Sequence, residues 1–320
     1  MGNRAALAPM AGITDRPMRA LAARFGAGWV VSEMIASDAL ATGQCDMVRR
    51  LASWESGLPH VVQLAGNEPH WMALGAKLAQ EAGAEIIDIN FGCPAKRVTN
   101  GYAGSALMRT PERARRLIDA VTGATDLPVT VKMRLGWDDM SLAAPAFAEM
   151  TVAAGAQLVT VHARTRCQFY KGHARWALVR DVVEAVEVPV VINGDITELS
   201  TARRAMELSG AAAVMIGRGA QGQPWIVGQI GAALDGKPAP EAPRGTLLID
   251  LVAEHYEAML SEYGTRIGAR AARKHLDWYL AANAPGVPAA LRRALLTETR
   301  PERVLAMVGD VFSGPDEVAA

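Results

Sequence analysis

The chain has 320 residues, of which half are hydrophobic and 21% are charged. This composition is typical of a folded protein with a large core, and it excludes a disordered chain or a mini-protein that needs covalent staples. The 33 basic and 33 acidic residues give a formal net charge of zero. Taken alone, that balance argues against a protein that binds nucleic acid through its overall charge.

Short apolar runs rich in β-branched residues recur eight times in the first two thirds of the chain, as expected for buried parallel strands. The predicted strands are residues 5–8, 29–31, 61–64, 86–89, 129–133, 158–161, 190–192 and 213–216. Stretches with helical period lie between most of them, including residues 69–82, 111–122, 142–154 and 199–208. A Gly-Ala pair precedes four of the strands, which fits a glycine that ends a helix and turns the chain.

Eightfold alternation of strand and helix predicts an α/β protein with a (β/α)8 barrel of about 250 residues. A doubly wound open sheet is the alternative, and the strand count favours the barrel. We expect the barrel domain to span residues 1–235, followed by a Pro/Gly-rich linker at 236–245. From 246 to 320 the pattern is wholly helical, with predicted helices at 246–263, 266–282 and 289–296 and a short segment after Pro301. The second domain is therefore small and helical.

The chain carries no recognisable targeting or membrane segment. Its N-terminus lacks the apolar core of a signal peptide, and no apolar run approaches the roughly 18 residues of a membrane span. The three cysteines share no CxxC spacing, so we expect neither a metal site nor a disulfide framework. Unpaired thiols are typical of a reducing compartment, so we expect a cytoplasmic protein with no membrane partner.

Polar side chains stand at the predicted strand ends, where the active sites of such barrels are found. Gln63, Asn90, Lys132 and His162 lie near the ends of four successive strands. Any one of them could simply be a hydrogen-bonded structural group. Because all of these strand ends meet at one mouth, an accidental collection is a much weaker explanation than a site.

Two glycine-rich turns follow the last two predicted strands, where barrels commonly hold a phosphate. They are Asn193-Gly194-Asp195 and Gly217-Arg218-Gly219. Glycine lets the backbone approach a ligand closely, and Arg218 could add a charged contact. Two ordinary tight turns would give the same pattern.

A phosphate clamp together with a cation and an amide describes an FMN site. Lys132 could stabilise the N1/C2 region of a reduced flavin, Gln63 could bond the pyrimidine edge, and Pro9 and Met10 could pack on the ring. No G-x-G-x-x-G motif opens a βαβ unit, so any NAD(P)H would visit transiently.

Cys93 lies in a predicted long loop, residues 90–108, after the fourth strand. Loops of this length in a compact barrel are usually functional, so the thiol could act as a nucleophile or a proton donor. A buried, inert thiol is the alternative for Cys93 and the expectation for Cys45 and Cys167.

The sequence resembles the tRNA-dihydrouridine synthase family, most closely its bacterial B-type subfamily. The matching stretches run in order along nearly the whole chain: LAPMAGITDRP at 7–17, VQLAG at 62–66, DINFGCPAKRV at 88–98, GSAL at 104–107, VKMR at 131–134, HARTR at 162–166, NGDI at 193–196, IGRG at 216–219 and RKHLDWY at 273–279. Ala163 departs from the glycine more usual there but leaves His162 and the arginines intact.

The resemblance implies an FMN enzyme that reduces the C5–C6 double bond of uridines in tRNA, with NADPH as reductant. Hydride would pass from reduced FMN to C6, and Cys93 would protonate C5 as the general acid. A thiol with its ordinary pKa of about 8.5 is protonated at neutral pH and suits that role. The target base must leave the tRNA stack to reach the barrel. The implied cofactor residues are Pro9, Met10, Ala11, Gln63, Lys132, His162, Asn193, Gly194, Asp195, Gly217 and Arg218.

The expected partner is tRNA, bound by a protein that we expect to be monomeric. Asn90 and Arg134 are the expected contacts to uracil. Residues 264–303 hold eight basic and three acidic residues, so the neutral chain has a strongly basic segment. The residues expected to contact RNA phosphates are Arg164 and Arg166 in one barrel loop and Arg266, Arg270, Arg273 and Lys274 on one predicted helix face.

Two other functions remain open at this point. The first is an FMN barrel oxidoreductase that acts on a small molecule, although such a substrate would not need the helical domain. The second is a non-catalytic RNA-binding or regulatory protein, against which the convergent polar residues argue. The visible spectrum of the purified protein separates a flavoenzyme from a flavin-free RNA-binding protein.

Overall fold

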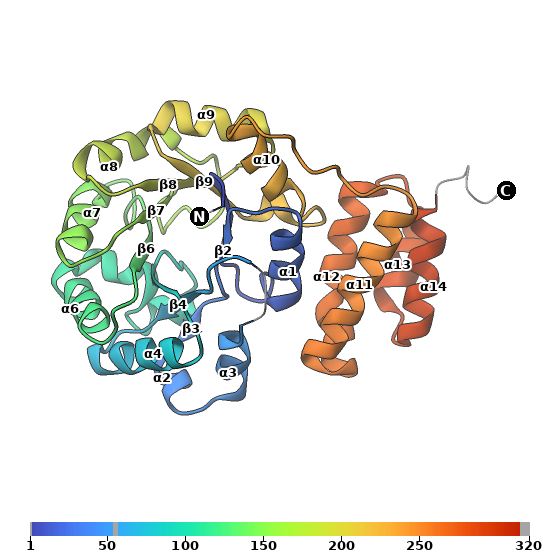
Figure 1. Cartoon of the computed structure of the whole chain (residues 1–320), viewed down its shortest axis with the longest axis horizontal. Coiled ribbons are helices and arrows are strands. Elements are labelled where there is room, and N and C mark those ends of the chain that lie inside the picture. Colours follow the sequence, from blue (N-terminus) through green and yellow to red (C-terminus); the bar gives the residue numbers. More distant parts are fainter. Residues whose placement is uncertain (1, 54–56, 314–320) are drawn as a thin grey trace.

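The computed structural model describes residues 2–53 and 57–313 (Figure 1). Within these residues nine parallel strands form one sheet: β1 (Ala5–Leu7), β2 (Trp29–Val30), β3 (Ile35–Ala36), β4 (Val61–Ala65), β5 (Ile86–Phe91), β6 (Val129–Arg134), β7 (Val159–His162), β8 (Val190–Asn193) and β9 (Ala213–Ile216). The sheet order is β2-β1-β9-β8-β7-β6-β5-β4-β3. A parallel bridge from Val31 to Val61 joins its two ends. The predicted (β/α)8 barrel is therefore confirmed.

The predicted second strand, residues 29–31, is present as β2 with Val31 bridged to Val61, and after a break a further short strand, β3, follows it at Ile35–Ala36. The structure therefore has one strand more than the sequence predicts. Ser32 lies at the break. Its N–H donates to the Val61 carbonyl at 3.0 Å, but its hydroxyl oxygen accepts the Gln63 N–H at 2.9 Å. A side chain thus replaces a backbone carbonyl in the ladder, and the two half-strands together fill one barrel position.

Helices surround the barrel as an outer ring (Figure 1). They are α1 (Arg16–Arg24), α2 (Ser37–Ala41), α3 (Cys45–Leu51), α4 (Pro69–Glu81), α6 (Pro111–Thr122), α7 (Ala144–Ala153), α8 (Arg180–Ala185), α9 (Leu199–Ser209) and α10 (Ile226–Leu234), whereas the one-turn helix α5 (Lys96–Thr99) lies in the loop after β5. Short 3₁₀ helices span Gly104–Arg109, Trp176–Val179 and Arg218–Ala220. The four predicted Gly-Ala turns are present, and Gly26, Gly83, Gly155 and Gly210 all have positive φ, a conformation that glycine adopts without strain.

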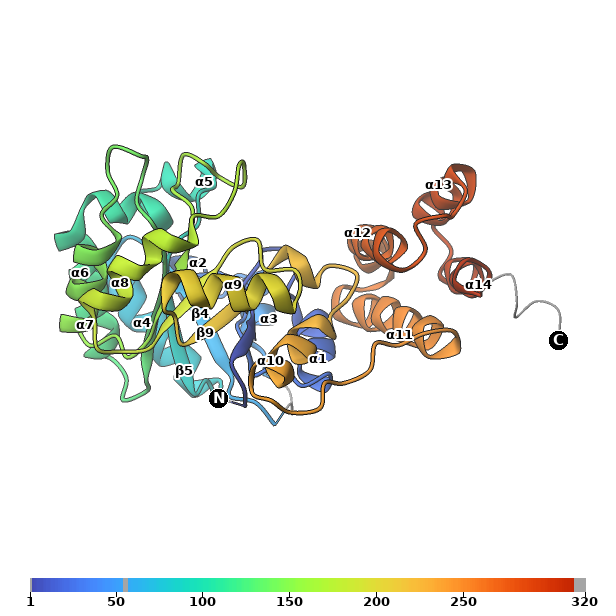
Figure 2. The ribbon, with the colours of Figure 1, turned by 90° about the horizontal axis from the view of Figure 1, so that it is seen from above.

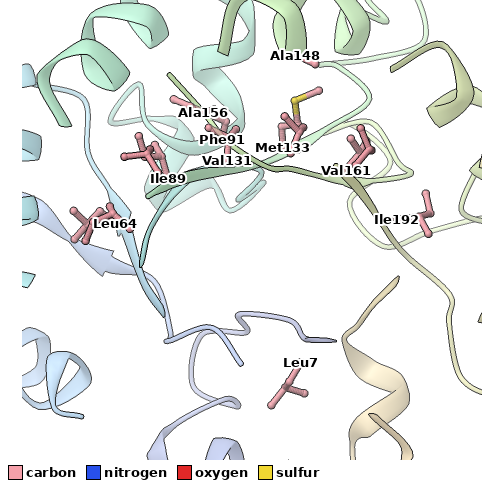
Figure 3. Packing of buried hydrophobic residues seen from close by; sticks show 14 of the residues in the cluster. Leu7, Leu64, Ile89, Phe91, Val131, Met133, Ala148, Ala156, Val161 and Ile192 are labelled. Atoms are coloured by element: carbon pink, nitrogen blue, oxygen red, sulfur yellow. The ribbon is translucent and has the colours of Figure 1, made fainter. Parts of the chain in front are cut away.

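The strands have two different faces because side chains alternate along them. One set points outward and packs against the ring of helices, forming the main core. Figure 3 shows part of it, with Leu7, Leu64, Ile89, Val131, Val161 and Ile192 contributed by six different strands. The other set points into the barrel, where apolar side chains such as Ala6, Val61 and Val191 form a second buried cluster. The polar strand-end residues belong to this inward set.

The C-terminal helices lie to one side of the barrel, beside α1 and α10 (Figures 1 and 2). They are α11 (Thr246–Tyr263), α12 (Thr265–Asn283), α13 (Ala289–Thr297) and α14 (Pro301–Phe312). The segment after Pro301 is thus a full helix, longer than predicted, and residues 314–320 of the predicted domain lie outside the described ranges. These helices share a core of their own, which Leu21 and Trp225 of the barrel join. None of the helices in the described ranges has the length and hydropathy needed to cross a membrane.

Two histidines are buried side by side in this second core. His255 Nδ1 lies 3.0 Å from the Tyr279 hydroxyl, and the ring centroids of His255 and His275 are 4.8 Å apart. Burial lowers the pKa of His255 to about 3 and holds the pKa of His275 well below its usual value. Both rings are therefore neutral in the folded protein at neutral pH.

Acid should destabilise the folded chain through this pair. Unfolded histidines bind protons near pH 6.5, so the unfolded state gains protons first as the pH falls. We expect the free energy of unfolding to fall below pH 6.5 by about 1.4 kcal/mol per pH unit for each histidine. Urea unfolding at pH 7 and pH 5 measures this, with His275→Gln as the comparison. The variant should lose less stability between the two pH values, and equal losses would contradict the prediction.

Candidate active site

A cavity of about 720 Å³ opens at the carboxyl ends of the barrel strands. The structure brings all of the predicted cofactor residues to this cavity, together with Asn90, Cys93, Arg134 and Arg164. They come from segments spread between β1 and β9 and meet only because the barrel closes. Arg166 and the four basic residues of α12 do not line the cavity.

The inner end of the cavity rests on a chain of buried hydrogen bonds. Asn90 Nδ2 donates to Gln63 Oε1 at 2.8 Å, and Gln63 Nε2 donates to Asp88 Oδ2 at 2.7 Å. Thr130 Oγ1 donates to Asp88 Oδ1 at 2.6 Å. Burial raises the pKa of Asp88, although these two hydrogen bonds oppose the shift. The sequence analysis did not identify Asp88 as a site residue. The pattern that pointed to it is an acidic residue two positions before Asn90, and therefore on the same face of the strand.

Lys132 is a half-buried cation in the wall of the cavity. Its ammonium donates to Asn193 Oδ1 at 3.1 Å, and Asn193 Nδ2 donates to the Met215 carbonyl at 2.8 Å. The ammonium is thus held against β8, in the direction of the glycine turns. Burial, followed by the charge of Arg134, lowers the pKa of Lys132 to about 8. The side chain is therefore mostly charged at neutral pH and loses its charge in mild alkali.

Cys93 is fixed at the cavity by its backbone. Its N–H and the N–H of Gly92 donate to Asn90 Oδ1 at 2.9 and 3.1 Å. Its carbonyl accepts from the Ser105 N–H at 3.1 Å and the Ser105 hydroxyl at 2.8 Å. The predicted long loop is therefore an ordered segment that contains α5 and the 3₁₀ helix Gly104–Arg109. Asn90 and Ser105 thus hold the backbone of Cys93 from both sides.

The other two cysteines lie away from this position. Cys45 is the first residue of α3, and Cys167 follows Arg166 in the loop after β7. Both are exposed, so the expectation that they are buried was wrong, whereas the expectation that they are inert stays a prediction. The residues next to each cysteine in the sequence do not show whether its side of the helix or loop packs against the rest of the protein.

The glycine turns after β8 and β9 lie at the outer end of the cavity. Gly194 has φ +121°, and a Cβ there would lie 3.0 Å from the His162 ring, so only glycine fits. Asp195 is ion-paired with Arg164 at 2.6 Å and with Arg218 at 3.5 Å. Burial alone would raise the pKa of Asp195, but hydrogen bonds from Arg164 and the Ala174 N–H hold it below its usual value. The Asp195 side chain is therefore a charged carboxylate that pairs with these two arginines.

His162 lies among cations. Burial, followed by the charges of Arg134, Lys132, Arg164 and Arg218, holds the pKa of His162 well below its usual value. The ring is therefore neutral at pH 7 and can both donate and accept a hydrogen bond in the cavity. This concentration of positive charge makes the cavity suited to an anionic ligand.

Arg134 and Arg164 are buried and bind loop carbonyls. Arg134 Nε donates to the Gly92 carbonyl at 2.7 Å, and its Nη1 donates to the carbonyls of Thr165 and Phe169 at 2.9 Å each. Arg164 donates to the Lys171 carbonyl at 3.2 Å and to the Gly172 carbonyl at 2.7 Å. These contacts fix the loops after β5 and β7 relative to each other.

An arginine–aromatic stack forms the rim beside the cavity. Arg166 lies over the rings of Trp137 and Phe169, with centroid distances of 4.6 and 4.8 Å. Tyr170, an exposed aromatic that lines the cavity, has Arg218 at 5.3 Å from its ring centroid. Sequence reasoning missed Tyr170, because nothing in the loop sequence showed that its ring would face the mouth.

The predicted basic face of α12 is only partly a free surface. Arg266 and Arg270 are exposed, whereas Arg273 and Lys274 are half-buried. Lys274 Nζ donates to the Gly12 carbonyl, in the turn after β1. Of the four predicted RNA contacts on α12, Lys274 therefore already has a partner in the barrel. The contacts of the other three with RNA stay predictions.

The fold and the cavity define a (β/α)8-barrel protein with a cation-lined site at the carboxyl ends of its strands and a helical domain beside it. A sequence model of the family "Dihydrouridine synthase (Dus)" matches residues 6–311. The chain belongs to the dihydrouridine synthase family.

Similar curated proteins extend over most of the chain. "Probable tRNA-dihydrouridine synthase" of Rhodobacter capsulatus is 54% identical over 308 residues, covering 96% of this chain and 94% of that protein. "tRNA-dihydrouridine synthase B" of Pseudomonas aeruginosa is 44% identical over 280 residues, covering 87% and 84%. These relatives and the family match confirm the resemblance predicted from the motifs.

Two solved structures show the same fold at low sequence identity. Histamine dehydrogenase from Rhizobium sp. 4-9 has a TM-score of 0.56 and 16% identity, covering 80% of this chain and 49% of that chain. A morphinone reductase mutant in complex with tetrahydroNAD has a TM-score of 0.51 and 13% identity, covering 75% and 88%. At such identities the likeness extends to the barrel fold alone.

Proposed function

We propose that this chain is an FMN-dependent tRNA-dihydrouridine synthase that reduces the C5–C6 double bond of uridines in tRNA, with NADPH as reductant. One observation carries the proposal: the Cys93 thiol, the Lys132 ammonium and two glycine turns share one cavity in a chain of the dihydrouridine synthase family. The names of the relatives supply the substrate class, since they are called tRNA-dihydrouridine synthases.

The cavity residues fit FMN. The volume of about 720 Å³ lies within the usual range for small-molecule and cofactor sites. Arg218 and the backbone of the two glycine turns would hold the phosphate, and Lys132 and Gln63 would contact the ring. Pro9, Met10 and Ala11 form an apolar wall against which a flat ring could pack. Bound FMN would supply hydride chemistry, which no side chain provides.

The chain's own residues would orient the uracil and supply a proton. Cys93 would donate its thiol proton to C5, in a position fixed by Asn90 and Ser105. Asn90 lines the cavity beside the thiol, so its amide could also hold the uracil edge. Arg134 would act mainly by fixing the two loops around the base, because its guanidinium donates to their carbonyls. NADPH would reach the same mouth transiently.

The barrel and the C-terminal helices would have different functions. We propose that residues 1–235 form the catalytic barrel, that 236–245 link the domains and that 246–320 bind tRNA. Exposed Arg266 and Arg270 on α12 support this division, because exposed guanidinium groups suit phosphate contacts. On the barrel side, the half-buried Arg166 at the cavity rim would add a further contact to the bound tRNA. A helical domain of this size also argues against a small-molecule substrate.

Reversing two charges on α12 should weaken tRNA binding without affecting the flavin. For the double variant Arg266→Glu and Arg270→Glu we expect an increase in KM for tRNA of about tenfold or more at low salt, because phosphate contacts dominate affinity. NADPH oxidation by free oxygen should stay within about twofold, because neither residue lines the cavity.

The matched control is the double variant Arg116→Glu and Arg203→Glu, which makes the same charge change on α6 and α9. Both control residues are exposed on the outer helices of the barrel. Equal KM changes in the two double variants, or equal losses of tRNA reduction and NADPH oxidation in the α12 variant, would contradict a specific role for α12.

Mapping dihydrouridine in tRNA from a strain without this gene tests the function directly. The modification should disappear from defined positions and return when the gene is restored. An unchanged pattern would refute the substrate assignment, and a purified protein without flavin absorbance or FMN affinity would refute the cofactor assignment.

We propose further that the protein acts in the cytoplasm as a metal-free monomer, which sedimentation and metal analysis of the purified protein would test.

A further inference from the structure

One wall of the cavity is a short turn that the helical domain holds from outside the barrel. The turn follows β1, and three of its residues, Met10, Ala11 and Ile13, line the cavity. Its internal hydrogen bonds all join Met10 to Ile13 and Thr14 and leave the Ala11–Gly12 segment between them without one: the Met10 N–H donates to Thr14 Oγ1 at 2.7 Å, and the Met10 carbonyl accepts from the N–H groups of Ile13 and Thr14 and from Thr14 Oγ1. What lies behind the turn therefore matters for its shape.

Gly12 is held by hydrogen bonds to both its N–H and its carbonyl group. It has φ +73°, a backbone conformation that favours glycine. Its N–H donates to Glu33 Oε1 at 2.6 Å, and Glu33 is only 2% exposed. Its carbonyl accepts from the ammonium of Lys274, which is 262 residues away in sequence and belongs to α12. The barrel thus holds one side of this peptide and the helical domain holds the other.

A second contact supports the same turn. The Tyr263 hydroxyl at the end of α11 donates to Asp15 Oδ2 at 2.8 Å, and Asp15 caps α1 by accepting the Met18 N–H at 3.1 Å. Beside it, Glu262 pairs with Arg16 at 2.6 Å and with Arg49 at 3.0 Å, with its side chain 3% exposed. The corner between α11 and α12 is therefore fixed to the barrel by buried and half-buried polar contacts.

We propose that Lys274 is a positioning residue of the cofactor site: by holding the Gly12 carbonyl, it sets the wall formed by Met10, Ala11 and Ile13. The helical domain then does more than bind RNA, because it completes the cavity. This inference rests on the proposed FMN site. It also gives Lys274 a different role from the exposed arginines of the same helix, since its ammonium already has a partner and is half-buried.

FMN binding to the full-length protein tests this role. The cofactor is removed, and its dissociation constant is then measured by quenching of flavin fluorescence for the parent, Lys274→Met and Lys274→Arg. We expect Lys274→Met to raise the dissociation constant about threefold to tenfold, because a charge-assisted hydrogen bond that shapes the wall is lost. Lys274→Arg keeps a charged donor and should recover at least part of the affinity.

Lys77→Met is the matched control, since Lys77 is exposed on α4 outside the site and undergoes the same chemical change. It should bind FMN like the parent. If Lys274→Met does not fold, Tyr263→Phe replaces it, because that variant removes only the hydroxyl contact to Asp15. It should raise the FMN dissociation constant by about twofold or more.

The outcomes separate the two proposals. Unchanged FMN affinity in Lys274→Met, or in Tyr263→Phe where that variant replaces it, would overturn the positioning role, and so would a lower melting temperature with no change in affinity. A raised KM for tRNA with unchanged FMN affinity would make Lys274 a phosphate contact and would also overturn it. If the parent itself binds no FMN, the proposed function fails first, and the positioning role fails with it.

Discussion

Replacing Cys93 with alanine should give a folded, yellow protein that accepts electrons from NADPH but forms almost no dihydrouridine. We expect the rate of tRNA reduction to fall about 10²- to 10⁴-fold, the usual contribution of a general acid in the transition state. FMN retention should be unchanged, because Asn90 and Ser105 hold the loop through backbone groups that alanine keeps. Single-turnover reduction of tRNA by the pre-reduced enzyme measures the affected step.

Cys45→Ala is the control for this experiment. It makes the same change at an exposed position on α3, outside the cavity, and should react like the parent. A Cys93→Ala enzyme that modifies tRNA at the parental rate would remove Cys93 from the proton-donor role. A protein that had lost its flavin would instead give the loop a role in holding the cofactor.

Lys132→Ala should lose most of its flavin during purification. The half-buried ammonium donates to Asn193 in the cavity wall, and the loss of a hydrogen bond to a charged group raises a dissociation constant about tenfold to a hundredfold. The ratio of flavin to protein absorbance, and FMN titration of the apo-protein, measure the effect. Arg218→Ala should weaken FMN less, because Arg218 is exposed and its charge is screened by solvent.

The pH dependence gives an independent check on Lys132. Because burial lowers the pKa of Lys132 to about 8, the parent should lose FMN affinity as the pH rises through 8, where the ammonium gives up its proton. Lys132→Ala has no such group and should show a flatter dependence between pH 7 and 9. A Lys77→Ala protein should behave like the parent. Parallel pH profiles for the parent and Lys132→Ala would contradict the assignment.

The sequence predicted the barrel and most of the cavity for a simple geometric reason. Buried parallel strands show themselves as apolar runs, and their carboxyl ends must meet at one mouth once the sheet closes. Gln63, Asn90, Lys132 and His162 could therefore be placed together from their positions at the strand ends. The glycine turns after β8 and β9 could be placed at the same mouth by the same reasoning.

The sequence did not predict how those residues are partnered. The Arg164 pairing with Asp195, the carbonyl contacts of Arg134 and the exposure of Cys167 depend on the path of the loops, and local sequence leaves that path open. The break at Ser32 has the same origin, because a side chain competed with a backbone carbonyl for one N–H group. In each case the partners are close in space but distant in sequence. The local sequence around one partner therefore does not predict the other.

The fold class, the family and the set of residues at the barrel mouth could all be predicted from the chain of amino acids, because periodicity and motifs are local properties. Which basic residues of α12 are exposed depends instead on how the helices pack. Arg270 and Lys274 are one helical turn apart and equally basic, yet one is exposed and the other binds the Gly12 carbonyl across the domain contact. Helical period fixes the side of the helix, but the packing of α11 and α12 against the barrel fixes which part of that side solvent can reach.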